Sequence, residues 1–250
     1  VADRLEALGY ADPASALRHL EALTSGVSRR AAIQRTLLPV MLGWFADAPD
    51  PDAGLLGFRR VSDVLGATHW YLRLLRDESI AAERLARVLA TSRYATDLLL
   101  RAPESVGMLA DEADLEPRSL PALLAEVTSV VDRHEEPENA VAAIRSVRRR
   151  ELFRIAVAEV LHVAGPEQAG EALSDVAIAA VDGALRVAGY SVDGAGEDVV
   201  AFAVIGMGRF GGHELGFGSD IAVMLVFDPR PGADETEATN AAAALAEEMR

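Results

Sequence analysis

The chain contains no cysteine among its 250 residues. Disulfide bridges, thiolate metal sites and cysteine nucleophiles are therefore excluded. No run of 18 apolar residues is present, so no membrane-spanning helix is predicted. The N-terminus carries Asp3, Arg4 and Glu6 in place of the apolar centre of a signal peptide. We therefore expect a cytoplasmic protein without a membrane partner.

Basic and aromatic residues are also scarce. Lysine and arginine number 24 against 39 acidic residues, which gives a net charge of −15. Proteins that bind nucleic-acid phosphates need a basic surface, so this charge argues against a nucleic-acid partner. Aromatic residues make up only 5% of the chain, and the core must be built from Leu, Val and Ala, a composition that favours helices.

The histidines do not form a metal-binding pattern. None of the five is separated from another by the short spacing that places two ligands on one helix face. They are His19, His69, His134, His162 and His213. The sequence therefore does not predict a zinc site.

Most of the chain has apolar residues spaced three and four apart, the pattern of amphipathic helices. Asp12 followed by Pro13 is a typical helix start, and Ser28 is a second N-cap. We expect helices at 12–23, 28–45, 55–65, 68–76, 79–90, 92–100, 103–110, 119–133, 137–160 and 166–188. A loop is expected at 49–54.

The composition changes at 189–198, where glycines and acidic residues predict a flexible joint. Beyond it, two apolar runs at 199–205 and 221–227 predict strands, and Asp234 predicts the cap of a last helix. The expected fold class is mainly α, a multi-helix bundle followed by a small α/β portion. The expected domains are 1–188, a helical region, and 199–250, joined by 189–198.

The most informative segment is GMGRFGGHELGFGSD at 206–220, which lies between the two predicted strands. Gly206, Gly208 and Gly211 match the dinucleotide-binding pattern G-x-G-x-x-G, and Asp228 stands 22 residues after Gly206, where a ribose-binding acid is expected. That pattern also requires a helix that opens at its third glycine. Three further glycines follow before the next strand, so we disfavour a dinucleotide fold.

A nucleotidyltransferase is the alternative that this segment favours. Such enzymes place a Gly-Gly or Gly-Ser turn before a strand that carries Asp-x-Asp. Strand side chains alternate between faces, so two acids two residues apart can share magnesium ions on a triphosphate. The chain offers Gly211-Gly212 and then Ser219-Asp220-Ile221-Ala222.

The segment 203–227 resembles the second catalytic domain of the bacterial glutamine-synthetase adenylyltransferases, which both transfer and remove adenylyl groups. The shared features are Gly-Met-Gly-Arg-Phe-Gly-Gly, then Glu-Leu, then Gly-Ser-Asp. Segments at 91–104, 114–118 and 148–152 also resemble this family. The resemblance therefore covers most of the chain, as an internal piece of such an enzyme.

The resemblance implies a nucleotidyltransferase fold for the α/β portion. It also implies that AMP moves from ATP to a tyrosine of glutamine synthetase with the help of Mg²⁺, and that a separate N-terminal domain removes it. Asp220 would bind the metal, Gly211 and Gly212 would form the turn, and Ser219 would contact the triphosphate. Arg209 has either a phosphate contact or a surface role. The helical region would link the two catalytic domains and relay signals from glutamine and a nitrogen-status signal protein.

The sequence departs from the family at position 222, where the second motif aspartate is replaced by Ala222. Asp228 cannot replace it, because at 3.3 Å per strand residue it lies roughly 26 Å from Asp220. Glu214 is a possible substitute without a positive argument for it. No later strand with a third carboxylate is expected, so we expect no adenylyl transfer by this chain alone. The alternative is a non-catalytic helical interaction module with a degenerate nucleotide-binding fold.

A basic run lies on the long predicted helix at 137–160. Its members are Arg145, Arg148, Arg149, Arg150 and Arg154. One interpretation is a solvated face with pairing to Glu151 and nearby acids. The other is a docking surface for an acidic partner or for nucleotide phosphates.

Overall fold

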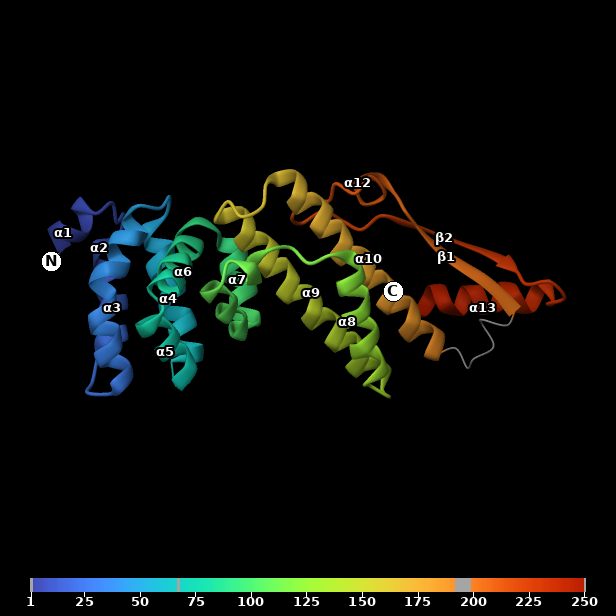
Figure 1. The fold of residues 1–250 in the computed structure, drawn as a ribbon, viewed down its shortest axis with the longest axis horizontal. Coiled ribbons are helices and arrows are strands. Elements are labelled where there is room, and N and C mark those ends of the chain that lie inside the picture. Colours follow the sequence, from blue (N-terminus) through green and yellow to red (C-terminus); the bar gives the residue numbers. More distant parts are fainter. Residues whose placement is uncertain (1, 67, 192–198, 250) are drawn as a thin grey trace. The chain divides into compact units, whose positions relative to one another are not determined.

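The computed structural model describes residues 2–66, 68–191 and 199–249. Its contacts divide the chain into two compact units, each discontinuous in sequence. The first comprises Val1–Glu116 with Phe153–Gly165, and the second comprises Pro117–Leu152 with Pro166–Arg250. Helices dominate both units, and the second also contains a two-stranded sheet, which confirms the expected fold class (Figure 1).

The first unit is helical throughout its described residues. Its α-helices are α1 (Ala2–Ala7), α2 (Pro13–Thr24), α3 (Arg29–Ala46), α4 (Pro51–Leu65), α5 (His69–Asp77), α6 (Ser79–Thr91), α7 (Arg93–Arg101) and the part of α9 (Pro137–Val160) that begins at Phe153. Two 3₁₀ helices follow α7, η1 (Pro103–Ala110) and η2 (Ala113–Leu115). The core of this unit is made of aliphatic side chains and a few rings, among them Phe45 and Phe58, whose ring centroids are 6.3 Å apart.

Helix starts follow the capping chemistry that the sequence indicates. The carboxylate of Asp12 accepts a hydrogen bond from the Ser15 N–H at 2.8 Å, and the Ser28 hydroxyl accepts one from the Ala31 N–H at 3.1 Å. The expected loop at 49–54 is wrong, because α4 already begins at Pro51. Asp50 caps it through the Ala53 N–H at 3.0 Å, with proline at the first helical position.

The second unit contains α8 (Leu120–Asp132), α10 (Pro166–Ser191) and the part of α9 (Pro137–Val160) that ends at Leu152. Gly183 of α10 lies where α8 and α9 approach it most closely. A β-carbon at Gly183 would be only 2.5 Å from Val127 Cγ1 and 2.9 Å from Ile144 Cδ1. The lack of a side chain at this position therefore permits the close packing of these helices.

A buried ion network joins α8 to α9 within the second unit. Glu151 is 1% exposed, and its carboxylate lies 3.0 Å from the Arg150 guanidinium and 3.5 Å from that of Arg118. Glu126 also accepts hydrogen bonds from both arginines. Burial alone would raise the pKa of Glu126, but the hydrogen bonds from Arg150 and Arg118 outweigh it and hold that pKa below its ordinary value. Pairing of the basic run with Glu151 is thus confirmed for Arg150.

The α/β portion of the second unit consists of β1 (Val200–Gly206), the short α12 (Gly208–Gly211), β2 (Val223–Pro229) and α13 (Glu235–Glu248). The two strands are antiparallel, with Gly206 opposite Val223 and Val200 opposite Pro229. The second strand was expected at 221–227 and begins two residues later, at Val223. Asp234 caps α13 as expected, because its carboxylate accepts hydrogen bonds from the N–H groups of Thr236 and Glu237.

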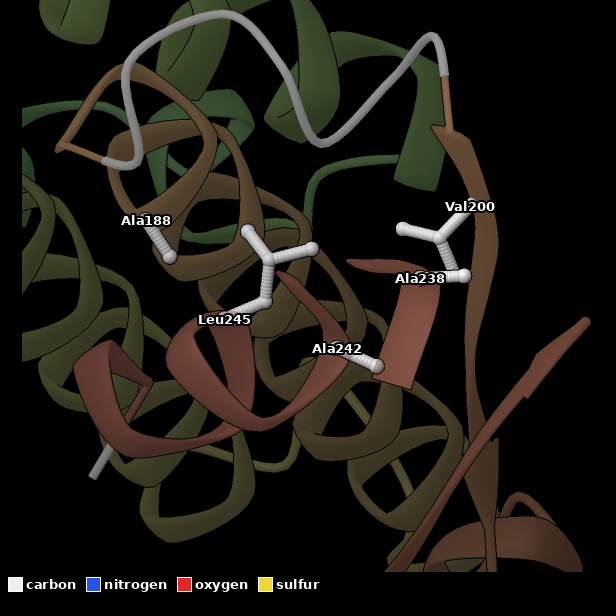
Figure 2. Close-up of a cluster of buried hydrophobic side chains, with 5 residues drawn as sticks. All are labelled: Ala188, Val200, Ala238, Ala242 and Leu245. Carbon is white, nitrogen blue, oxygen red and sulfur yellow. The ribbon is translucent and has the colours of Figure 1, made fainter. Parts of the chain in front are cut away.

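A small apolar cluster attaches α13 to β1 and α10. Its members are Ala188 of α10, Val200 of β1, and Ala238, Ala242 and Leu245 of α13. Figure 2 shows the side chain of Leu245 directed from α13 towards Ala188, while Val200 lies beside Ala238. Several other strand side chains stay exposed, among them Ile205 at 41%, Met224 at 46% and Phe227 at 44%. The sheet therefore buries less apolar surface than the helices do.

The expected joint at 189–198 coincides only in part with described residues. Helix α10 continues to Ser191, three residues beyond the expected end, and residues 192–198 lie outside the described part of the chain. A domain boundary at this position stays a prediction. Among the described residues, no helix combines the length and the apolar character that crossing a bilayer requires.

Candidate functional site

The glycine-rich segment forms a tight turn at the end of β1. A β-carbon at Gly211 would lie 2.4 Å from the carbonyl oxygen of Gly206, a distance that real side chains do not reach. Gly208 adopts φ +55°, in the left-handed region that glycine occupies at least cost. The Met207 N–H donates to the Ala222 carbonyl at 2.9 Å, which extends the strand pairing into the turn. The sequence pattern of closely spaced glycines is thus explained by the close approach of two backbone segments.

The two glycines of the Gly-Gly turn have different surroundings. Gly211 cannot accept any side chain, as described above. A β-carbon at Gly212 would lie 3.4 Å from both the Glu214 Cγ atom and the Gly208 carbonyl oxygen, which small shifts can accommodate. Both residues are exposed, so their backbone is accessible to a ligand. Of the two positions, only Gly211 therefore requires glycine for steric reasons.

The loop after the turn is anchored on α10. Leu215 is buried, and its N–H donates to the hydroxyl of Ser174 at 3.3 Å, while that hydroxyl donates to the Gly170 carbonyl at 2.8 Å. A β-carbon at Gly170 would lie 3.4 Å from the Leu215 carbonyl oxygen and 3.5 Å from the Glu214 Cα atom. Gly170 and Ser174 thus form a docking surface for the loop. The sequence interpretation missed both, although two small residues four apart on a helix were a usable signal.

A second contact between the loop and α10 involves charge. The His213 Nδ1 atom lies 3.9 Å from the Asp175 carboxylate. Burial raises the pKa of Asp175, and Glu171 adds to this effect, whereas His213 and a backbone hydrogen bond from Leu120 oppose it. His213 itself adopts φ +58°, which is uncommon outside glycine. These features fix the middle of the loop against the helix.

Ser219 closes the last turn of the loop. Its hydroxyl accepts the Gly216 N–H at 3.1 Å, and its own N–H donates to the Gly216 carbonyl at 3.0 Å. The structure therefore shows that Ser219 caps this turn. A hydroxyl that accepts one hydrogen bond can still donate another, so the predicted contact with a triphosphate stays a prediction.

Arg209 is exposed and lies on the same side of the loop as Ser219. A β-carbon built at Gly216 would have the Ser219 Oγ atom at 3.4 Å and the Arg209 Nη1 atom at 3.8 Å. The structure thus brings together a guanidinium group and a hydroxyl group around Gly216. A guanidinium beside a hydroxyl is a suitable donor pair for phosphate oxygens.

Asp220 follows Ser219 and is exposed. It lies before β2 rather than at its first residue, because the strand begins at Val223. Ala222 contributes only its backbone carbonyl, the partner of the Met207 N–H. Within the described ranges there is no group of three or more His, Cys, Asp or Glu side chains that could hold a metal ion. Asp220 is therefore not part of such a group, and its predicted role as a metal ligand stays a prediction.

The dinucleotide-binding interpretation finds no support in this geometry. The helix after the third glycine would have to be long enough to direct its dipole at a pyrophosphate, but α12 ends at that glycine after 4 residues. The flanking strands are antiparallel, whereas a dinucleotide-binding unit uses parallel strands. The turn therefore belongs to another class of fold.

Comparison with known proteins identifies the family. Residues 82–250 match the family model described as glutamate-ammonia ligase adenylyltransferase. A bifunctional glutamine synthetase adenylyltransferase/adenylyl-removing enzyme from Streptomyces avermitilis is 55% identical over 266 residues, which cover 99% of this chain and 26% of that protein. The protein of the same name from Leifsonia xyli is 51% identical over 248 residues, 98% of this chain and 24% of that protein.

A third relative, the protein of that name from Mycolicibacterium smegmatis, is 45% identical over 255 residues, 99% of this chain and 25% of that protein. The chain thus spans about a quarter of the length of the curated relatives that it matches. The family model covers well over half of the chain, including both the glycine loop and α10. The chain belongs to the glutamate-ammonia ligase adenylyltransferase family.

Proposed function

We propose that this chain is part of an enzyme that transfers AMP from ATP to a tyrosine hydroxyl of glutamine synthetase. In this proposal another part of the enzyme removes the AMP, so that nitrogen assimilation is regulated in both directions. The proposal is supported by the family assignment and by the names of the relatives, which describe adenylyl transfer to and removal from glutamine synthetase. A nitrogen-status signal protein as second partner and a cytoplasmic location stay predictions from the sequence.

The observation that carries the proposal is the exposed Gly211-Gly212 turn that follows β1. A phosphate group can reach a backbone only where no side chain intervenes, and this turn presents exposed backbone at Gly211 and Gly212. Arg209 and Ser219 flank the following turn and would donate to phosphate oxygens. The acceptor tyrosine oxygen would attack the α-phosphorus in line with the leaving pyrophosphate. The role of this chain in that step is to bind and orient the nucleotide.

Magnesium is the metal that accompanies ATP in such transfers, where it polarises the phosphate oxygens. The described residues do not make up a two-ion site, because they contain no group of three or more candidate ligands and position 222 offers only an alanine methyl. Mg²⁺ prefers octahedral oxygen coordination and several carboxylate or phosphate ligands. We therefore assign no step of the reaction to a metal held by this chain, and we propose that the chain alone has no transferase activity.

The test is isothermal calorimetry of ATP with Mg²⁺, comparing the chain with its Ala222→Asp variant. We expect the aspartate to strengthen Mg²⁺-dependent binding of ATP by roughly tenfold or more, since it restores a second carboxylate two residues from Asp220. An Asp220→Asn, Ala222→Asp double variant is the matched control and should bind no better than the starting chain. Incorporation of labelled AMP into glutamine synthetase by the unaltered chain should stay at background.

A second candidate function is a non-catalytic helical interaction module with a degenerate nucleotide-binding fold. The alanine at position 222 is the observation that favours it. If neither the chain nor the Ala222→Asp variant binds ATP, this second function replaces the first. Robust AMP transfer by the unaltered chain would refute both the second function and the proposed inactivity.

A further inference from the structure

A basic cavity lies in the first unit, between the start of α3 and α5. It has a volume of about 270 Å³, and its basic lining residues are Arg29, Arg30, His69, Arg73 and Arg76. No acidic side chain is among its lining residues. Since the chain carries 39 acidic and only 24 lysine and arginine residues, a cavity lined by four arginines and no acid is contrary to the overall composition.

Two of the four arginines form no ion pair within 4 Å in the described part of the chain. Arg30 pairs with Asp63 at 3.0 Å, and Arg76 pairs with Asp77 at 2.7 Å, both carboxylates outside the cavity lining. The guanidinium groups of Arg29 and Arg73 are in exposed residues and form neither an ion pair nor a hydrogen bond with any described residue, although the charge of Arg73 helps to lower the pKa of Asp77. Guanidinium groups gathered around one cavity repel each other, so an anion among them would be attracted strongly.

One guanidinium is held in position by the fold itself. A β-carbon at Gly66 would lie 2.5 Å from the Arg30 Nε atom and 2.6 Å from its Cζ atom. The absent side chain at Gly66 therefore leaves the space that the Arg30 guanidinium occupies. Asp63 also pairs with this guanidinium, at 3.0 Å. Arg30 is thus preorganised at the edge of the cavity, which lowers the entropic cost of binding a ligand there.

The first turns of the adjoining helices strengthen the positive potential. Neither α3 nor α5 has an acidic residue in its first turn, and both begin with basic residues, Arg29 and Arg30 in α3 and His69 in α5. Basic groups at a helix N-terminus are unfavourable because the helix dipole is positive there. An anion in the cavity would offset this cost, in addition to its contacts with the arginines.

We propose that this cavity binds a small oxyanion with two negative charges, either free phosphate or the phosphate group of a small monoester. The planar guanidinium fork matches such oxygens with paired hydrogen bonds. The volume is below the roughly 300–1,000 Å³ of pockets for drug-sized ligands, which disfavours a nucleoside triphosphate. The cavity belongs to the first unit, whereas the glycine loop belongs to the second, so this is a separate binding site.

Calorimetric titration of the whole chain tests the proposal. The probes are inorganic phosphate and ribose 5-phosphate, with the ionic strength kept constant with chloride. We expect saturable binding, weakened about tenfold by either Arg29→Gln or Arg73→Gln, which corresponds to one charge-assisted hydrogen bond of about 1.4 kcal/mol. Arg101→Gln is the matched control, because Arg101 is exposed in the same unit and does not line the cavity. Its affinity should stay within twofold of the unaltered chain.

The two probes distinguish the source of the oxyanion. Equal affinities indicate that the phosphate group alone is recognised, and tighter binding of ribose 5-phosphate indicates a monoester that also contacts Ile33 or Leu72.

A second experiment needs no variant. Phenylglyoxal modifies arginine side chains, and peptide mass spectrometry should show that phosphate protects Arg29 and Arg73 but not Arg101. The proposal fails if phosphate neither binds beyond the chloride background nor protects these arginines. Binding of hexaglutamate without binding of phosphate would also refute it, in favour of an acidic protein partner.

Discussion

Two buried polar side chains differ in whether their hydrogen-bonding groups have partners. Gln34 is 0% exposed, and both its amide nitrogen and its amide oxygen lack a hydrogen-bond partner among the described residues. An unsatisfied buried polar group costs about 1–3 kcal/mol. In contrast, the buried Ser174 satisfies its hydroxyl twice, through the Gly170 carbonyl and the Leu215 N–H. Gln34 therefore lowers the stability of the helix packing around it, whereas Ser174 stabilises the glycine-rich loop.

We predict that Gln34→Met raises the free energy of unfolding by about 1–2 kcal/mol. Methionine has a similar shape without the polar atoms, so the substitution removes the cost of the unpaired amide and adds apolar burial. Urea denaturation followed by circular dichroism gives this value. Gln34→Glu is the opposing control and should destabilise the chain, because it would bury a charge. A loss of stability in the methionine variant would mean that the amide has a partner, such as a bound water.

At the scale of residues, helix caps are the features that the sequence can predict. Caps at Asp12, Ser28 and Asp234 depend on neighbouring residues only, so the sequence was sufficient to predict them. The helix start at Pro51 carries the same Asp-Pro signal as Asp12-Pro13, although the sequence analysis predicted a loop there. The contact of Ser174 with Leu215 spans 41 residues, and no local pattern encodes such a partner.

At the scale of elements, packing determines how two glycines of α10 respond to substitution by alanine. Gly183 of α10 faces Val127 and Ile144 closely, whereas a β-carbon at Gly189 of the same helix would meet nothing within 4 Å. Both substitutions to alanine gain helix propensity of up to about 1 kcal/mol. Only the first must also displace side chains in a packed interface.

We therefore predict opposite signs for the two alanine variants. Gly183→Ala should lower the free energy of unfolding by about 1–2 kcal/mol net, because overpacking typically costs 1–3 kcal/mol and exceeds the gain in propensity. Gly189→Ala should raise it by about 0.5 kcal/mol, since that position lies near the end of the helix. Thermal and urea denaturation of both variants give the comparison. Stabilisation by both substitutions would show that α8 and α10 are not packed as described.

The glycine turn shows the limit of prediction at this scale. The sequence indicated a phosphate-approach loop between two strands, and both strands and the loop are present. It placed Asp220 at the start of the second strand, but β2 begins at Val223. The start of a strand depends on backbone pairing, such as the Met207 N–H with the Ala222 carbonyl, which side chains do not reveal. Similarly, Gly211 tolerates no side chain and Gly212 does, because the Gly206 carbonyl lies against Gly211 alone, a position that the sequence does not show.

For the whole molecule, the contacts group α8, part of α9, α10 and the α/β portion in one unit. The predicted boundary at 189–198 would instead separate α10 from the strands. Leu215 packs against α10, and Leu245 of α13 belongs to a cluster that includes Ala188 of α10. The α/β portion therefore uses a helix from before the predicted boundary to cover its apolar side chains.

We predict that residues 199–250 do not fold as a separate polypeptide. Without α10 the apolar cluster loses Ala188 and the loop loses Ser174, and a two-stranded sheet is at best marginally stable by itself. Circular dichroism and urea titration of this fragment should show no cooperative transition, whereas a fragment of residues 117–250 should show one. Cooperative unfolding of the shorter fragment would contradict this prediction and support a domain boundary at 189–198.

Helix α10 supports the α/β portion at two places, Ser174 near its beginning and Ala188 near its end. At 1.5 Å per residue these positions are about 21 Å apart along a single stiff rod. A shift of α10 along its axis would therefore carry the glycine loop and α13 together, in the same direction and by a similar amount. Lengthening or shortening this helix by one residue between the two anchors would rotate one of them by about 100° relative to the other, and so uncouple the loop from the strand that precedes it.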